Sequence, residues 1–130
     1  MNTLSDAEWA VMEILWEHES CTLGKISEIL AVSKGWRQNT VYTYLTRMEA
    51  KGLVSIDKNC TPHRYSYAVS REICAKAERS SLLQKVYKGA AGDLIAAFLK
   101  ESKISEKERK ELRKMLDDMD VLTRKRRCGL

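Results

Sequence analysis

The sequence has no long hydrophobic run, and this absence excludes a membrane-spanning helix from the expected structure. No stretch of the 130 residues approaches the roughly 18 to 20 apolar residues that a span requires. The first residues, MNTLSDAEW, also lack the basic and apolar regions of a signal peptide. We therefore expect a cytoplasmic protein without membrane insertion.

Cysteine and histidine are too sparse to suggest a metal centre. The four cysteines, Cys21, Cys60, Cys74 and Cys128, include no CxxC pair, which in a reducing cytosol favours free thiols. The stretch Cys60-Thr-Pro-His63 could supply half a metal site, but the chain has two histidines and no second ligand pair nearby. We predict no metal and no cofactor, and we expect a loop at this stretch.

Acidic residues are scarce in the middle of the chain. Residues 1–33 carry one lysine against six acidic residues, a net charge of −5. Residues 34–64 carry six basic residues against Glu49 and Asp57, a net +4, and residues 65–130 carry sixteen against ten, a net +6. The total of +5 therefore conceals two basic regions. Local concentration of positive charge is what predicts a polyanionic partner.

Two helices are expected before residue 31. Ser5-Asp-Ala-Glu8 forms a capping box ahead of Trp9, so a first helix is predicted at about 5–18, with its tryptophans in the core. Thr22 can cap a second helix that ends at about Leu30, followed by the connector AVSKGW.

The segment GWRQNTVYTYLTRMEAKGLV, residues 35–54, predicts a third helix despite its β-branched content. Val41, Leu45 and Met48 recur at helical spacing, so we expect a helix at about 38–51 that Gly52 ends. The opposite face carries short hydrogen-bonding groups, a phenol and one guanidinium, which would suit an anionic partner with polar edges. Its residues are Asn39, Thr40, Tyr42, Thr43, Thr46 and Arg47.

A hairpin is expected after the third helix. Leu53–Ile56 and Arg64–Val69 are typical of short strands, and the loop between them holds the only proline. Three helices followed by a hairpin is the order of a winged helix-turn-helix, so the predicted fold is mainly α. The third helix would then enter the major groove of DNA. Phosphate or minor-groove contacts are expected from Arg37, before that helix, and from the wing residues Lys58, His63 and Arg64.

The C-terminal half predicts amphipathic helices at about 71–88, at 93–100 and from Ser105 onward. The preceding domain already has a core, so their apolar stripes should meet a second copy of the chain. We therefore predict a winged-helix domain at 1–70, a helical dimerisation region at 71–120 and a disordered basic tail at 121–130. The expected dimerisation residues are Leu83, Val86, Tyr87, Leu94, Phe98, Leu112, Met115, Leu116 and Met119.

The chain resembles the BlaI/MecI family of bacterial repressors. The resemblance rests on LSDAEWAVMEILW (4–16), WRQNTVYTYLTRMEAKGLV (36–54), LLQKVYKGAAGDLIAAFLK (82–100) and SEKERKELRKML (105–116). It implies a homodimer that binds a dyad-symmetric DNA operator and represses transcription of resistance or stress genes. By position, Asn39, Thr40 and Thr43 resemble the family's major-groove contacts and Arg47 its phosphate clamp.

The chain departs from the family pattern at two places. Asn39 and Tyr42 stand where close relatives have basic residues, and an asparagine pairs best with adenine, which favours an A·T position in the operator. Antibiotic-responsive members are cleaved between Asn and Phe after a signal from a membrane sensor. The matching pair in this chain is Ala97-Phe98, which is the candidate cleavage site. The CxC pairs of the copper-responsive branch are absent.

Two other classes of function compete with DNA binding, and a third alternative keeps it. An enzyme would need a base near a nucleophile or paired carboxylates in a pocket, whereas the acidic residues are expected on exposed helical faces beside Lys and Arg. We therefore predict no enzyme and no small-molecule substrate. A helical adaptor could bind protein through 71–119. A third variant keeps DNA binding but makes the protein a metal or redox sensor through its cysteines; both alternatives stay open at this point.

Overall fold

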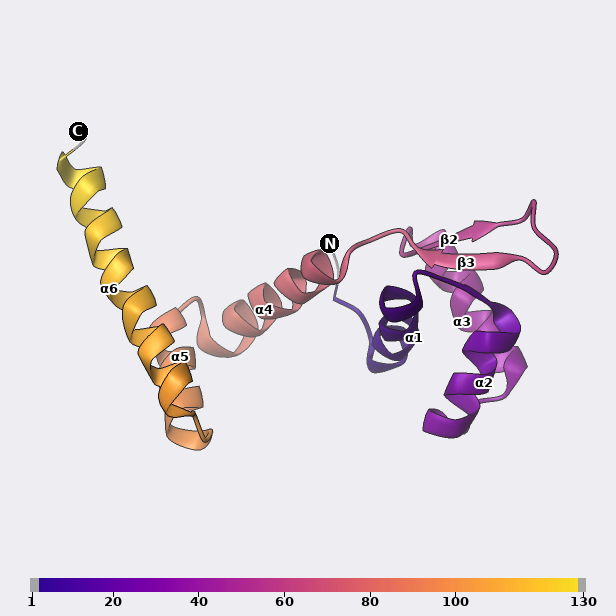
Figure 1. Cartoon of the computed structure of the whole chain (residues 1–130), viewed down its shortest axis with the longest axis horizontal. Coiled ribbons are helices and arrows are strands. Elements are labelled where there is room, and N and C mark those ends of the chain that lie inside the picture. Colours follow the sequence, from indigo (N-terminus) through magenta and orange to yellow (C-terminus); the bar gives the residue numbers. More distant parts are fainter. Residues whose placement is uncertain (1–2, 129–130) are drawn as a thin grey trace. The chain divides into compact units, whose positions relative to one another are not determined.

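The structure, a computed structural model, describes residues 3–128, with side chains described through residue 120 (Figure 1). The chain divides into two compact units between Val86 and Tyr87. The helix predicted at 71–88 thus falls mostly in the first unit, whereas the sequence grouped it with the dimerisation region. The last helix is assigned across the predicted boundary at residue 120. Arg124–Arg127 and Cys128 lie outside the residues whose side chains are described, so the disordered tail stays a prediction.

The first unit is a winged helix-turn-helix followed by a long helix, which confirms the predicted fold class. Its sheet is antiparallel, with strand order β1-β3-β2. Its elements are α1 (Asp6–His18), β1 (Ser20–Thr22), α2 (Leu23–Lys34), α3 (Gln38–Ala50), β2 (Val54–Asp57), β3 (Arg64–Tyr67) and α4 (Arg71–Tyr87).

The helix starts follow the predicted caps. At α1, the Glu8 amide donates to Ser5 Oγ at 3.1 Å and the Ser5 amide donates to Glu8 Oε1 at 2.9 Å, which completes the capping box. At α2, the Lys25 amide donates to Thr22 Oγ1 at 3.3 Å. The predicted end of α2 at Leu30 is wrong by about one turn, because the last turn is solvent-exposed and contributes no buried residue to the apolar period.

Strand β1 was not predicted from the sequence. It is three residues long, too short to show a period of two, and only Cys21 within it is buried. Its hydrogen-bonding partner is the central strand β3, where Cys21 lies opposite the buried Tyr65. The strand therefore exists because β3 offers it a free edge, which is a tertiary effect.

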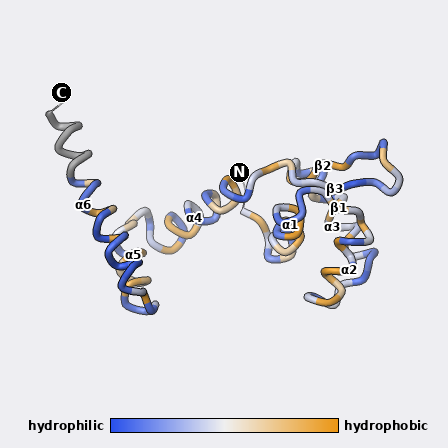
Figure 2. The backbone as a smooth tube through the Cα atoms, viewed as in Figure 1, coloured by the Kyte–Doolittle hydropathy of each residue, from blue (hydrophilic) through white to orange (hydrophobic). Residues whose placement is uncertain are grey.

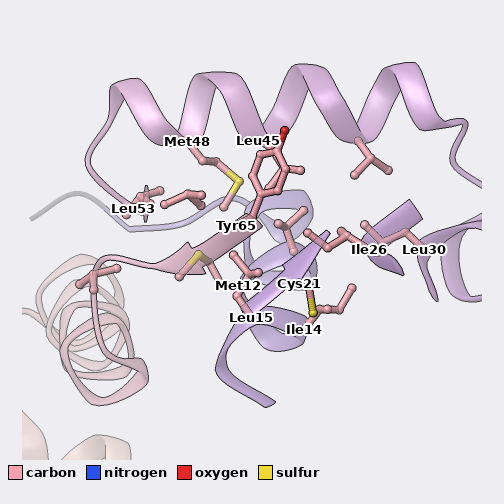
Figure 3. Close-up of a cluster of buried hydrophobic side chains, with 14 of the residues drawn as sticks. Met12, Ile14, Leu15, Cys21, Ile26, Leu30, Leu45, Met48, Leu53 and Tyr65 are labelled. Atoms are coloured by element: carbon pink, nitrogen blue, oxygen red, sulfur yellow. The ribbon is translucent and has the colours of Figure 1, made fainter. Parts of the chain in front are cut away.

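The core joins α1, α2, α3 and the sheet. Val41, Leu45 and Met48 are 0% exposed, as their helical spacing predicted, and Figure 3 shows Tyr65 beside Leu45 and Met48. The buried apolar residues are Val11, Met12, Ile14, Leu15, Cys21, Ile26, Leu30, Val41, Leu45, Met48, Leu53, Val54, Tyr65, Val69 and Cys74.

The two tryptophans of α1 pack at the edge of the core and contact each other. Trp9 and Trp16 are partly buried, and their rings meet edge to face with centroids 5.4 Å apart. Trp16 Nε1 donates to the Val69 carbonyl at 2.9 Å, which joins α1 to the segment that follows β3. The expectation that these tryptophans belong to the core is thus met in part.

The second unit consists of α5 (Ala91–Glu101) and α6 (Glu106–Cys128). Ser105 caps the start of the last helix, because the Glu108 amide donates to Ser105 Oγ at 3.1 Å. Hydrophobic positions recur along both helices in Figure 2, yet none of their described residues is buried. Among the helices that the structure describes, none is long and apolar enough to cross a lipid bilayer.

Candidate nucleic-acid interface

The outward face of α3 is polar and exposed along its whole length. Asn39, Thr40, Tyr42, Thr43, Thr46 and Arg47 are all exposed, as predicted from their spacing. Residues 34–48 include no Asp or Glu, so negative charge enters α3 only at Glu49, near its C-terminal end, where the side chain is half-buried. Because the opposite face is fully buried, the helix presents these side chains from a fixed backbone.

The turn before α3 is held by an aromatic contact. Gly35 ends α2 in the left-handed region at φ 70°, where glycine is favoured. Trp36 then stacks on Tyr44 of α3 with ring centroids 5.2 Å apart and an interplanar angle of 27°. Arg37 occupies the N-cap position and makes no side-chain cap hydrogen bond. The Thr40 N–H donates to the Arg37 carbonyl at 3.0 Å. Because no side chain caps the N–H groups before it, this end of α3 is suited to an anionic ligand such as a phosphate.

Two threonine hydroxyls on this face donate to their own helix. Thr43 Oγ1 donates to the Asn39 carbonyl and Thr46 Oγ1 to the Tyr42 carbonyl, each at 2.9 Å. With its hydrogen used in this way, each hydroxyl can still accept a hydrogen bond from a base amino group. The methyl group of Thr43 can also contact a thymine methyl.

The far end of α3 is joined to α1 by an ion pair. Lys51 Nζ donates to Glu8 Oε2 at 2.8 Å, and the Glu8 side chain is only 9% exposed. Burial alone would raise the pKa of Glu8, but the Lys51 ammonium and the Ser5 backbone together lower this pKa below its ordinary value. The expectation that acidic residues lie on exposed helical faces is therefore wrong for Glu8.

The wing and α3 enclose an open hollow of about 520 Å³. Lys58 and His63 lie exposed in the loop between β2 and β3. Gln38, at the first position of α3, was not singled out from the sequence, although it is exposed and directly precedes Asn39. The hollow is lined by Thr22, Leu23, Gly24, Gln38, Tyr42, Thr61, Pro62, His63 and Tyr65.

The family model described as Penicillinase repressor matches residues 4–118. The chain belongs to the penicillinase repressor family. This result confirms the resemblance that the sequence motifs suggested.

The methicillin resistance regulatory protein MecI of Staphylococcus aureus (strain N315) is 32% identical over 115 residues, covering 88% of this chain and 93% of its own length. The penicillinase repressor of Bacillus licheniformis is 26% identical over 115 residues, covering 88% and 90%. The solution structure of the DNA-binding domain of the repressor BlaI is similar at 27% identity and a TM-score of 0.49, covering 55% of this chain and 90% of that one.

In this family member, one predicted wing contact is already engaged. Arg64 Nε donates to Ser20 Oγ at 2.9 Å, and Arg64 Nη2 donates to the Ser20 carbonyl at 3.0 Å. The guanidinium is therefore held by β1, whereas Lys58 and His63 extend from the loop at the end of the hairpin.

The three cysteines of this penicillinase repressor family member whose side chains are described, Cys21, Cys60 and Cys74, are free thiols. Burial raises the pKa of Cys21 and that of Cys74. Cys60 donates to Asp57 Oδ2 at 3.3 Å, and this hydrogen bond to a carboxylate raises the pKa of Cys60 as well. Within the described residues, no three His, Cys, Asp or Glu side chains gather where they could hold a metal ion. A raised thiol pKa leaves less reactive thiolate, so the pKa shifts do not favour a sensor of oxidants.

The candidate cleavage pair of this family member lies inside α5. Ala97 is half-buried, whereas Phe98 is 54% exposed. A protease would need this helix to open, because cleavage sites are preferred in exposed, irregular segments.

Proposed function

We propose that this member of the penicillinase repressor family is a cytoplasmic DNA-binding transcriptional repressor. The observation that carries the proposal is the outward face of α3, which is exposed, free of carboxylates from Gln38 through Met48, and fixed by three fully buried residues on its other side. An α-helix of this kind fits the major groove of B-DNA. The adaptor alternative would leave this face without a role.

The residues of the interface fall into two groups by chemistry. Asn39, Thr40, Tyr42 and Thr43 would contact base edges, because amide and hydroxyl groups can pair with the donors and acceptors there. The remaining contacts, from Arg37, Thr46, Arg47, Lys58 and His63, would go to the sugar–phosphate backbone and fix the position of the protein.

The second unit supports a homodimer. In α5 and α6, large apolar side chains such as Phe98 and Leu116 are more than half exposed, and no described residue of either helix is buried. Helices without tertiary packing are marginally stable in water, so we propose that a second copy covers these faces. Two α3 helices would then bind half-sites about 34 to 36 Å apart, or a multiple of one turn.

Selection of bound duplexes from a random pool at roughly 0.15 M salt tests this function, because such salt suppresses purely electrostatic binding. The native chain should enrich a dyad motif, and Thr43→Ala/Arg47→Ala should not. A matched control is Ser33→Ala/Lys34→Ala, which also removes one hydroxyl and one positive charge, here from the exposed end of α2. If the folded dimer enriches no sequence, the adaptor function becomes the better account.

Release from DNA would follow from loss of the dimer. Linking two half-site modules raises the effective concentration of the second, so separated subunits should bind weakly. We propose that cleavage between Ala97 and Phe98, triggered by a membrane sensor, would separate the subunits by breaking α5. Mass analysis of the chain from induced cells tests this: an intact chain under full induction would exclude this route.

A further inference from the structure

Arg64 and Ser20 form a two-point contact that joins the wing to β1. The guanidinium directs Nε at the Ser20 hydroxyl and Nη2 at the Ser20 carbonyl, at 2.9 and 3.0 Å. Two parallel N–H groups thus meet two oxygens of one residue, a geometry that the planar fork of arginine favours and a lysine cannot reproduce. We call this pair the wing clasp.

The register of the sheet places the wing clasp on the face opposite α3. Tyr65 is buried and lies beside Leu45 and Met48 of α3 in Figure 3, so Tyr65 faces α3. Neighbouring residues of a strand point to opposite faces, and Arg64 therefore points away from α3. Arg64 lies opposite Thr22 in the register, which makes Ser20 its diagonal neighbour on the outer face.

The wing clasp acts on the segment that starts α2. Thr22 is both the last residue of β1 and the N-cap of α2. A bond between β3 and Ser20 therefore ties the central strand of the wing to the first helix of the helix-turn-helix. Because β1 is only three residues long, these side-chain bonds add substantially to its pairing with β3.

We infer that Arg64 is a positioning residue that orients the wing, so that Lys58 and His63 reach the DNA backbone, and that it does not neutralise a phosphate itself. This inference rests on the proposed DNA binding. The two bonds to Ser20 use two of the five N–H donors of Arg64 and fix its guanidinium on the face of the sheet turned away from α3. A direct phosphate contact would have to come from the remaining donors on that face, whereas Lys58 and His63 lie exposed in the loop at the end of the hairpin.

Binding of the full-length chain to its selected operator duplex, measured by fluorescence anisotropy over a salt series, tests the wing clasp. Ser20→Ala removes one acceptor and no charge. We expect it to weaken binding about three- to tenfold, as the loss of one hydrogen bond would. The log–log salt slope should become shallower by up to about 0.9 per subunit, because the loosened wing loses the Lys58 contact.

Three further variants sharpen this test. Ser66→Ala is the matched control: Ser66 lies opposite Ser20 in the register and shares its face, but it is not part of the clasp. It should bind like the native chain. Ser20→Thr keeps the hydroxyl and should restore affinity and slope. In an Arg64→Gln background, Ser20→Ala should weaken binding no further, because the two residues act as one unit.

The contrary results are distinct. If Arg64 binds phosphate directly, Ser20→Ala frees its guanidinium for that contact. Operator affinity should then stay equal or rise, and the log–log salt slope should be unchanged or steeper. If Ser66→Ala weakens binding as much as Ser20→Ala, the effect belongs to the sheet in general. Either result overturns the inference while leaving DNA binding intact. Failure of the native chain to select any operator would instead overturn the proposed function.

Discussion

Lys51 and Glu8 connect the C-terminal end of α3 to the N-terminal end of α1. The Lys51 ammonium, at the C-cap of α3, lies 2.8 Å from a Glu8 carboxylate that is also part of the α1 capping box. The same carboxylate thus caps the start of α1 and holds the end of α3. Since α3 carries the proposed base contacts, this pair contributes to holding the DNA-binding face in place.

Glu8→Gln should reduce the free energy of unfolding at neutral pH by about 1 to 3 kcal/mol, the usual cost of losing a buried charged hydrogen bond. The folded-state pKa of Glu8 lies below its ordinary value of 4.5, so the stabilisation is present above that pH and is lost as pH falls through the lower folded-state pKa. Urea unfolding across pH measures this. Glu17→Gln, on the exposed side of α1, is the control; an equal effect of both variants would contradict the role of Glu8.

Asn39→Ala should change base preference at one position of each half-site. A lost bidentate contact to adenine costs about 1 to 3 kcal/mol of discrimination, so the variant should tolerate other base pairs where the native chain requires A·T. Competition binding with single-substituted operators measures this preference. Gln84→Ala, which removes an amide from α4, should leave it unchanged. A uniform loss of affinity over all operators would place Asn39 on the backbone instead.

Arg47→Gln should weaken binding to all operators to a similar extent. A phosphate contact carries no sequence information, so base preference should stay, and the salt slope should fall by about 0.9 per subunit. Arg79→Gln is a suitable control, because Arg79 is an exposed cation that pairs with Glu72 on α4 at 2.8 Å. Equal slopes for Arg47→Gln and the native chain would remove Arg47 from the phosphate contacts.

Leu112→Asp or Leu116→Asp should lower dimer mass and operator affinity together. A carboxylate on the apolar face of α6 would be costly to bury against a second copy. Light scattering and operator binding on the same sample measure both quantities. Lys114→Asp, on the polar side of α6, should leave the mass unchanged. A dimer that survives both leucine variants would place the subunit contact elsewhere.

Cys60 should react slowly with iodoacetamide. Its pKa is raised, first of all by the hydrogen bond to Asp57, so less thiolate is present at a given pH than for an ordinary cysteine. Asp57→Asn should lower that pKa and speed the reaction. Peptide mass mapping over time measures the rate of alkylation at Cys60. If the rate is the same in both proteins, the contact with Asp57 does not control this thiol.

The sequence by itself determined the elements that carry their own periodic signal. The spacing of Val41, Leu45 and Met48 overrode the poor helix propensity of α3, because burying one face outweighs rotamer losses of β-branched residues. Ser5, Thr22 and Gly52 marked helix ends through local hydrogen bonding and backbone conformation. The polar face of α3 followed directly, since one buried face leaves the other to solvent.

Only the tertiary structure decided features that depend on residues far apart in the chain. β1 forms because β3 accepts it, Glu8 is buried because Lys51 lies across from it, and Arg64 is engaged because Ser20 is its diagonal neighbour. None of these partners lies within a helical turn or a hairpin of the other. Local patterns cannot encode such contacts, because they arise only when the packed core brings the strands and helices together.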